Sequence, residues 1–534
     1  MQTVSENWKR AHKQTLLNEG YVEVSLDIAD PEALADVSSQ DNGAVYISDT
    51  SQVVSEVDKK AVPYCTLEQN LWVLDGARKA IPVITYGESG YVGDVLSSDI
   101  CLFTDKIPVI TLNFSRVFDN IIPGITITWS PTYNEFADSF MVTVYSGDTI
   151  VAHREVEGNR SVKSVLMMDI VNYDRIVIMV TKWCLPYHRA RVEEIFVGVN
   201  RVYPKAELFG YSHTQSVNPL STSLSKTEIK FSIDNVDGEY DPLNEQGMSK
   251  YLMARQEVKS RYGLKLNDGT IEWIKGGTFY LSEWYAKQNG LTADFTARDL
   301  LEFMSPIYEE SHDLSPRTLY DLAELVLVAA NLPLNNDGTV KWVIDESLKS
   351  VTTTAPLPKD TLANCLQLIA HAGRCVLYQD RDGVLHVEPL EYEGTDYDMN
   401  TFNSYDKPEI TTSKPVKQVT VKVHHYTIGD RGIESTTTEV NQSTINGYKN
   451  GETIIVDNPL IVDVNHAFLV AAWMDVEFRR RTTLDFSWRA DVRLDALDLV
   501  RNVGKDHAEW VRMTDVEFTY NGAFRGTGEG KAVL

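Results

Sequence analysis

The densest group of side chains that could bind a metal or move a proton is a run of carboxylates at Asp234, Asp237, Glu239, Asp241 and Glu245. A calcium-binding loop places oxygen ligands at alternate positions and a glycine at the sixth, whereas this run has Val236 third and Gly238 fifth. The spacing therefore does not fit calcium. We interpret the segment as a turn between two strands, with Gly238 supplying an unusual backbone dihedral.

The sequence contains none of the common catalytic signatures. There is no GxSxG, HExxH or GxxxxGK[ST] pattern and no cysteine in a known nucleophile motif. The only adjacent histidines, His424 and His425, fall in an expected strand, so they point to opposite faces and are poorly placed to share a metal. Carboxylate pairs spaced for glycoside hydrolysis would arise by chance among 76 acidic residues. We expect no catalytic residue, no cofactor and no metal.

Exposed aromatic rings are the one plausible ligand-binding feature, because sugar rings stack on them. Trp129 shares its expected strand face with two isoleucines, so we expect it in a core. Tyr133, in the loop SPTYNE, and Tyr187, beside a histidine and an arginine, are better placed to be exposed. Tyr133 and Tyr187 are therefore the candidate carbohydrate contacts.

Three consecutive arginines, Arg479 to Arg481, end a predicted helix, where positive charge complements the helix C-terminus. Two interpretations stay open for them: a solvated helix end, or contact with an acidic neighbouring subunit.

Composition limits the class of protein. A chain of 534 residues, 43% hydrophobic, predicts about three to four globular domains. The net charge of −26 argues against binding nucleic acid or anionic membrane as the main task. There is no secretory signal and no apolar run of about 18 residues. The five dispersed cysteines lack a CxxC motif and indicate small buried hydrophobes of a reducing cytoplasm.

The elements that must position these residues are mostly strands. Residues 1–75 start with a helix from Val4 to Lys13, capped by Ser5, and a strand from Tyr21 to Ile28. Residues 76–200 have the texture of a jelly-roll β-sandwich, and 201–305 continue with strands. Residues 306–395 form a small α+β module, and 396–534 are again β, with one helix from Val464 to Arg479.

Three signals define the α+β module. A helix is expected to begin at Ser315-Pro316, and a second at Asp360 with Gly373 as its terminator. A hairpin then follows from Arg374 to Glu388, with its turn at Asp380 to Gly383.

Several long stretches of the chain resemble tail proteins of bacteriophages and of prophages of Gram-positive bacteria, the baseplate hub and tail-associated family. They are residues 207–252, WIKGGTFYLSEW, LTADFTARDLLEFM, TTLDFSWRADVRLDALDLV, VEFTYNGAFRGTGEG and the early PYCTLEQNLWVLDG. The resemblance implies two tube-type β-barrel domains, the first in 1–75 and 201–305 and the second in 396–534. The sandwich between them resembles a galactose-binding-like, carbohydrate-binding module.

The resemblance also implies a function. It implies a non-enzymatic structural component of a tail tip, a homo-oligomer and commonly a trimer, whose ring closes or extends the tail tube. Its partners would be tube, tape-measure and other baseplate or fibre proteins, with DNA only as passing cargo through an acid-lined conduit. The protein would be made in the bacterial host cytoplasm and located in the virion. Two alternatives stay open: an adhesin that binds cell-wall glycan through the sandwich, and a tail-associated cell-wall hydrolase.

Overall fold

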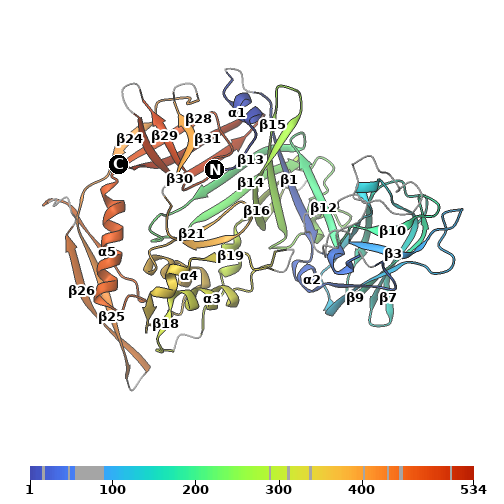
Figure 1. Ribbon diagram of the computed structural model, residues 1–534, viewed down its shortest axis with the longest axis horizontal. Coiled ribbons are helices and arrows are strands. Elements are labelled where there is room, and N and C mark those ends of the chain that lie inside the picture. Colours follow the sequence, from blue (N-terminus) through green and yellow to red (C-terminus); the bar gives the residue numbers. More distant parts are fainter. Residues whose placement is uncertain are drawn as a thin grey trace.

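The computed structural model describes residues 1–14, 18–45, 48–54, 90–287, 290–309, 313–335, 339–391, 393–400, 403–429, 432–443, 449–504 and 508–533. Strands dominate these residues and form several separate sheets (Figure 1). The expected mainly β, multidomain fold is thus confirmed. No helix in the described ranges combines the length and apolarity needed to cross a membrane.

A 13-stranded sheet forms the centre of the described structure. Its main path is, in spatial order, β12 (Gly198–Pro204), β1 (Gly20–Ala29), β15 (Glu257–Lys265), β16 (Ile271–Ala286), β17 (Thr292–Arg298), β14 (Lys226–Asp234), β13 (Leu208–Ser216), β30 (Ala508–Tyr520), β31 (Phe524–Val533), β28 (Thr482–Trp488) and β24 (Glu409–Thr412). Two further strands, β23 (Gly394–Met399) and β29 (Leu499–Val503), join it through β30. Alternating strands bury one face, as period-2 side-chain geometry requires.

The two stretches expected as separate tube-type domains share this one sheet. Strand β13 pairs with β30 from Tyr211 opposite Tyr520 to Ser216 opposite Asp515. One hydrophobic core lies beneath both halves, and the ring of Tyr262 packs against Phe524 with centroids 5.4 Å apart. The free edge of β13 explains the union, because an unpaired strand edge binds another strand through its backbone groups.

The N-terminal helix α1 (Glu6–His12) closes the same core. Its N-cap is Ser5, whose side chain accepts a hydrogen bond from the backbone of Trp8. Trp8 and Ala11 are buried. The predicted cap and the following strand β1 are both confirmed.

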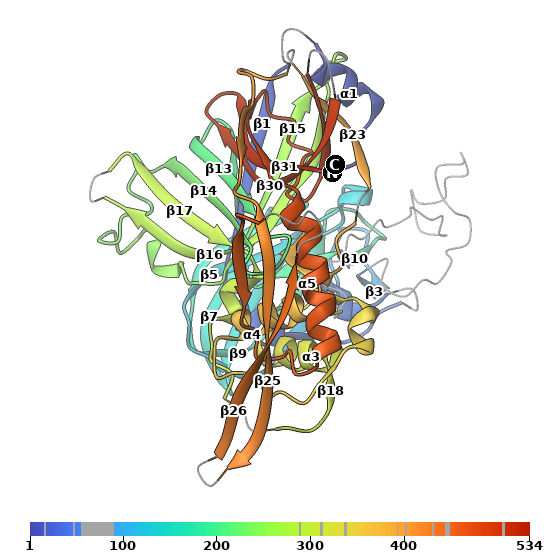
Figure 2. The same cartoon turned by 90° about the vertical axis from the view of Figure 1, so that its left-hand side faces the viewer.

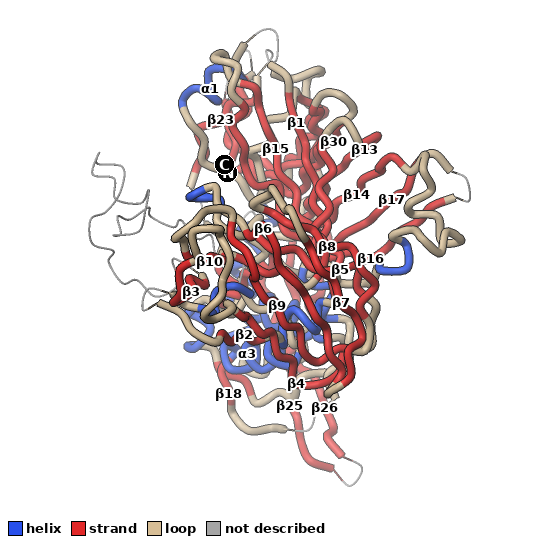
Figure 3. Tube along the Cα trace, turned by 90° about the vertical axis from the view of Figure 1, so that its right-hand side faces the viewer, coloured by secondary structure: helices blue, strands red, loops and turns tan. Residues whose placement is uncertain are grey.

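A β-sandwich is inserted between β1 and β12, which are neighbours in the large sheet. Ala29, the last residue of β1, lies opposite Gly198, the first of β12. One sandwich sheet has the order β2 (Ser38–Asp41), β4 (Val109–Phe118), β9 (Tyr173–Trp183), β6 (Ala137–Ser146) and β7 (Thr149–Val156). The other has the order β11 (Glu194–Phe196), β5 (Ile122–Thr128) and β8 (Lys163–Ile170), while β3 (Tyr91–Leu96) pairs with β10 (Arg189–Val192). Figure 3 shows these strands beside those of the large sheet.

The sandwich takes in residues from before position 76. Its strand β2 and the short helix α2 (Pro31–Asp36) belong to the stretch expected in the first tube-type domain. The register explains this difference, since the chain leaves the large sheet at Ala29. The stretch PYCTLEQNLWVLDG, with Cys65, lies outside the described residues.

The α+β module contains α3 (Leu319–Ala329), α4 (Leu362–Ala372), and the strands β18 (Arg317–Thr318), β19 (Trp342–Ile344), β20 (Thr352–Thr353), β21 (Val376–Gln379) and β22 (Leu385–Glu388). The hairpin of β21 and β22 is confirmed, and Gly383 in its turn has φ +79°. The module core is separate from that of the large sheet.

The starts of both module helices differ from the predictions. The N-cap of α3 is Thr318, not Ser315, because Thr318 and Asp321 bond reciprocally in a capping box. The Ser315 hydroxyl instead donates to Asp313. The N-cap of α4 is Thr361, one residue after Asp360.

The end of α4 is formed by two residues. Gly373 is the C-cap with an ordinary helical φ of −74°. Arg374, with φ +60°, provides the left-handed turn after it.

A hairpin and a helix from the 396–534 stretch pack on the module instead of on the large sheet. They are β25 (Val416–Gly429), β26 (Gly432–Ser443), the paired strand β27 (Glu452–Val456) and α5 (Val464–Arg479). The bounds of α5 agree with the prediction, and Asp463 caps it. Figure 2 shows the β25–β26 hairpin extending beyond the rest of the molecule, with α5 lying along it.

Candidate functional site

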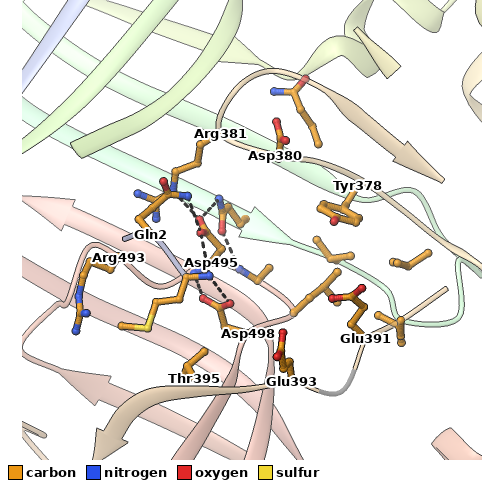
Figure 4. Close-up of a pocket in the computed structure, with 18 of the residues that line it drawn as sticks. Gln2, Tyr378, Asp380, Arg381, Glu391, Glu393, Thr395, Arg493, Asp495 and Asp498 are labelled. Carbon is orange, nitrogen blue, oxygen red and sulfur yellow. Dashed lines mark hydrogen bonds and ion pairs between the residues drawn. The ribbon is translucent and has the colours of Figure 1, made fainter. Parts of the chain in front are cut away.

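A cavity of about 610 Å³ lies where the chain start, the β21–β22 hairpin and the loop after β28 meet (Figure 4). Its walls include Met1, Tyr378, Arg381, Asp495 and Asp498. These residues come from distant parts of the sequence. The cavity is therefore a junction between the large sheet and the α+β module.

A buried arginine holds the junction together. The Arg381 side chain is 2% exposed, and its Nε donates to Asp495 at 2.6 Å. Its other nitrogens donate to the carbonyls of Lys275 and Leu494, at 2.9 and 2.8 Å. Burial favours the neutral form of Asp495, but the Arg381 charge outweighs it and lowers the pKa of that carboxyl.

The second junction carboxylate, Asp498, has the opposite shift. Burial, together with the negative charge of Asp495, raises the pKa of Asp498 to about 6. Two nearby carboxylates with separated pKa values are the pattern of an acid–base pair. Here their oxygens have partners: the Met1 amine donates to Asp498 at 2.6 Å, the Asp495 backbone N–H to Asp498 at 2.8 Å, and Gln2 and Gln215 to Asp495 at 3.3 Å. The pair thus suits a structural joint.

The opposite wall of the cavity contains a second paired cluster. The His386 ring stacks on Tyr378 with centroids 5.0 Å apart, and its nitrogens lie 3.0 Å from Asp380 and 3.4 Å from Glu388. Tyr378 donates to Glu388 at 2.6 Å. Each group thus serves another, which again indicates a structural joint.

Four carboxylates form a row across four neighbouring strands of the large sheet. Glu409 on β24 lies opposite Asp485 on β28, Asp485 opposite Glu529 on β31, and Glu529 opposite Asp515 on β30. Residues that lie directly opposite share one face of a sheet. The two residues that flank Asp485 are buried, so this acidic row is on the face away from the core.

The acidic row is an unfavourable arrangement for the sheet itself, since like charges directly opposite destabilise it. Burial raises the pKa of Glu529, and the charges of Asp515 and Asp485 raise it further, only partly offset by Lys531. The sequence analysis missed the row because its members come from four separate stretches, and only the strand register aligns them.

The carboxylate run Asp234 to Glu245 has the structural role expected. Asp234, Asp237 and Asp241 each accept a hydrogen bond from the backbone N–H two residues later. Gly238 has φ +71°. Among the described residues, no group of three or more His, Cys, Asp or Glu is arranged to hold a metal ion.

The two tyrosines proposed as carbohydrate contacts differ in their surroundings. Tyr133 is half-buried, and the Arg191 guanidinium lies 4.8 Å from its ring centroid. Tyr187 is 42% exposed and has φ +60°. Between them in the sequence, Glu135 accepts from buried Trp183 and contacts buried His188 at 3.0 Å. The predicted core position of Trp129 is confirmed.

The adjacent histidines have separate partners. His424 contacts Asp457 at 2.9 Å, and His425 contacts Thr438 at 2.9 Å. They do not converge on a common site, as expected for consecutive residues of a strand.

The three arginines at the end of α5 bond within the chain. Arg479 donates to Asp475 at 2.6 Å, Arg480 pairs with Glu477, and Arg481 donates to the Ser413 carbonyl at 2.9 Å. The interpretation as a merely solvated helix end is therefore wrong.

The fold and its sites define a mainly β, multidomain protein whose buried charges join its parts. No family model matches the sequence, and no curated protein does. Solved structures with similar folds include the 43 kDa tail protein of prophage MuSo2 from Shewanella oneidensis, at 12% identity and a TM-score of 0.41. The alignment covers 62% of this chain and 95% of that one.

Two further tail proteins are similar to the chain. One is from Neisseria meningitidis MC58, at 10% identity and a TM-score of 0.42, covering 62% of this chain and 93% of that one. The other is the prophage tail protein gp18 from Listeria monocytogenes EGD-e, at 10% identity and a TM-score of 0.38, covering 62% and 91%. Because these likenesses are low, we base the function on this chain's own residues.

Proposed function

We propose that the protein is a non-enzymatic structural subunit of a phage tail tip, in which the outer face of the large sheet lines a passage for DNA. The acidic row Glu409, Asp485, Glu529 and Asp515 is the observation that carries this proposal. The row repels phosphate and adds no binding term, so a nucleic acid can pass without adhering. A polyanion passage explains why the chain keeps a row that destabilises its own sheet.

The wider role follows from this geometry. A passage needs several copies around an axis, so the subunit forms a homo-oligomeric ring, a trimer in the family it resembles. The ring closes or extends the tail tube, binds tube, tape-measure and baseplate or fibre proteins, and is located in the virion after assembly in the host cytoplasm. The net charge of −26 suits a surface that must not retain DNA.

The decisive experiment locates the chain in particles. Phage or tail-like particles from the producing cell, labelled with an antibody to this protein, should carry the label at the tip of the tail. Label along the tube or on the fibres, or particles that lack the polypeptide, would overturn the proposal.

A second experiment addresses the acidic row. Particles carrying Asp485→Lys with Glu529→Lys should assemble but release DNA more slowly at low salt, because each lysine adds a phosphate contact. The matched control is Glu434→Lys on the β25–β26 hairpin, which should release DNA at the normal rate. Equal release by all three would remove the role assigned to the row.

The exposure of Tyr187 favours adhesion to cell-wall glycan as a second candidate function. Full-length chain should then bind purified wall polysaccharide saturably, and Tyr187→Ala should abolish most of that binding. The control is Tyr405→Ala, which removes another half-exposed ring far along the sequence. Absence of wild-type binding to any host wall would remove this candidate.

A further inference from the structure

The exposed side of helix α5 is apolar. The side chains that face away from the core along it are Val464, Phe468, Leu469, Ala472 and Val476. Phe468 and Leu469 are 44% and 52% exposed. Surface helices normally turn such a stripe toward a core. We call these five residues the α5 stripe, and the described part of the chain leaves it uncovered.

The charged side chains of α5 lie on its buried side. Asp475 is 2% exposed and pairs with Arg479 at 2.6 Å. Glu477 is 6% exposed and lies between Arg480 and Arg512. The helix is therefore inverted relative to the usual amphipathic pattern. Its sequence has carboxylates available and still presents apolar groups to the outside.

A second apolar patch lies at the free end of strands β14, β16 and β17. Its exposed members are Phe209, Val236, Leu243, Tyr285 and Leu291. Backbone pairing holds the segments together, since the N–H of Asn235 donates to the carbonyl of Leu291 at 2.9 Å. Figure 2 shows this end of β14 and β17 projecting from one side, away from α5. We call these five residues the tip patch.

The two surfaces have opposite charges beside their apolar groups. Exposed Asp234, Asp237 and Glu245 surround Val236 and Leu243 of the tip patch. The α5 stripe ends at the three arginines 479–481. One surface is thus apolar and acidic, and the other apolar and basic. Such a pair is complementary in both respects.

We infer that the α5 stripe of one copy docks on the tip patch of a second copy of this chain. This contact rests on the proposed homo-oligomeric function and says which surfaces form it. Because the two patches differ, each copy offers one to each neighbour, and the assembly is head-to-tail. A ring forms if the rotation closes.

The alternative self-contacts lack this charge match. Two tip patches would place carboxylates against carboxylates, which costs free energy between chains that each carry −26. Two α5 stripes would meet without any acidic partner for the arginines. The head-to-tail contact alone joins apolar surface to apolar surface and acid to base.

Cross-linking of differently tagged full-length chains tests the contact. Leu469→Cys is placed in one chain and Leu243→Cys in the other, and the mixture is treated with a short bismaleimide. A product containing both tags is expected from the mixture, and none from either variant alone. Wild-type chains give the background from the native cysteines, of which Cys365 and Cys375 are buried.

The cross-linking outcomes separate the alternatives. A product from Leu469→Cys alone would show stripe-to-stripe pairing and overturn the inference. Failure of the mixed pair to exceed the background would also overturn it.

Association equilibria provide an independent readout. Val476→Glu should raise the Kd of self-association, measured by sedimentation of the full chain, by about tenfold or more. The matched control Ile150→Glu changes a 56% exposed residue of β7 and should leave the Kd unchanged. A wild-type chain that stays monomeric at every attainable concentration would overturn this contact. Antibody label at the tail tip would still support the proposed function in that case.

Discussion

His386 shows how single charged residues stabilise the junction between the large sheet and the α+β module. Burial by itself would lower the pKa of this histidine, but hydrogen bonds with Asp380 and Glu388 outweigh burial and raise it to about 9. The imidazolium form is therefore the one that the folded protein stabilises. Stacking on Tyr378 holds the ring in place.

The first prediction is a pH dependence of stability. The folded-state pKa of about 9 exceeds the ordinary value of 6.5, so the contribution of His386 is complete below about pH 6.5. It is lost as the pH rises through 9. The free energy of unfolding, measured with urea, should fall over this range by more in the wild type than in His386→Gln. The control His425→Gln, whose ring contacts Thr438, should follow the wild type.

At the scale of elements, α5 shows that burial and hydrophobicity can be separated. Its carboxylates face inward because arginines from the helix end and from β30 meet them there. A buried carboxylate with a partner is tolerated, whereas a buried charge left without one is costly.

The second prediction compares the two sides of α5. Glu477→Ala should cost about 3 kcal/mol in the free energy of unfolding, because it leaves the 2% exposed Arg512 without that carboxylate. Phe468→Ser, on the exposed stripe, should cost less than about 1 kcal/mol. Urea denaturation of the two variants measures the difference. Equal costs would contradict the inverted orientation.

The third prediction concerns the strands that carry the acidic row. Glu529→Gln removes the charge between Asp485 and Asp515 and should stabilise the protein by roughly 0.5 kcal/mol at low salt. The gain should shrink as salt screens the repulsion. In the matched control Glu517→Gln, the residue lies opposite Thr527 and Thr214, so no gain is expected. Thermal unfolding over a salt series gives both values.

At the scale of the whole molecule, the sandwich is an insertion with its own core. It leaves and rejoins the large sheet at two residues that face one another, Ala29 and Gly198. A few polar contacts connect the two parts, such as Lys250 with Asp169 at 3.0 Å.

The fourth prediction is that the sandwich can be removed. A chain in which a two-residue Asn-Gly turn replaces residues 30–197 should keep the large sheet, since the turn would join β1 to β12 as an ordinary hairpin. Far-UV circular dichroism and calorimetry should show retained strand signal and the loss of one unfolding transition. An aggregated or unfolded product would show that the sandwich is needed by the sheet.

Local signals predicted the elements more accurately than their partners. The helix α5, the strand β1 and the β21–β22 hairpin follow from periodicity and turn residues within a few positions. The start of α3 was wrong because two suitable caps stand close together. Only the reciprocal bonds of Thr318 and Asp321 decide between them.

By itself, the sequence determined the strand-rich composition, the turn at Gly238, the buried Trp129 and the strong negative charge. These depend on nearby residues or on simple sums. The tertiary structure alone decided that β13 pairs with β30, that four carboxylates align, and that α5 presents its apolar side outward. Each of these depends on strand register or on packing between segments far apart in the chain, and no local pattern encodes that information.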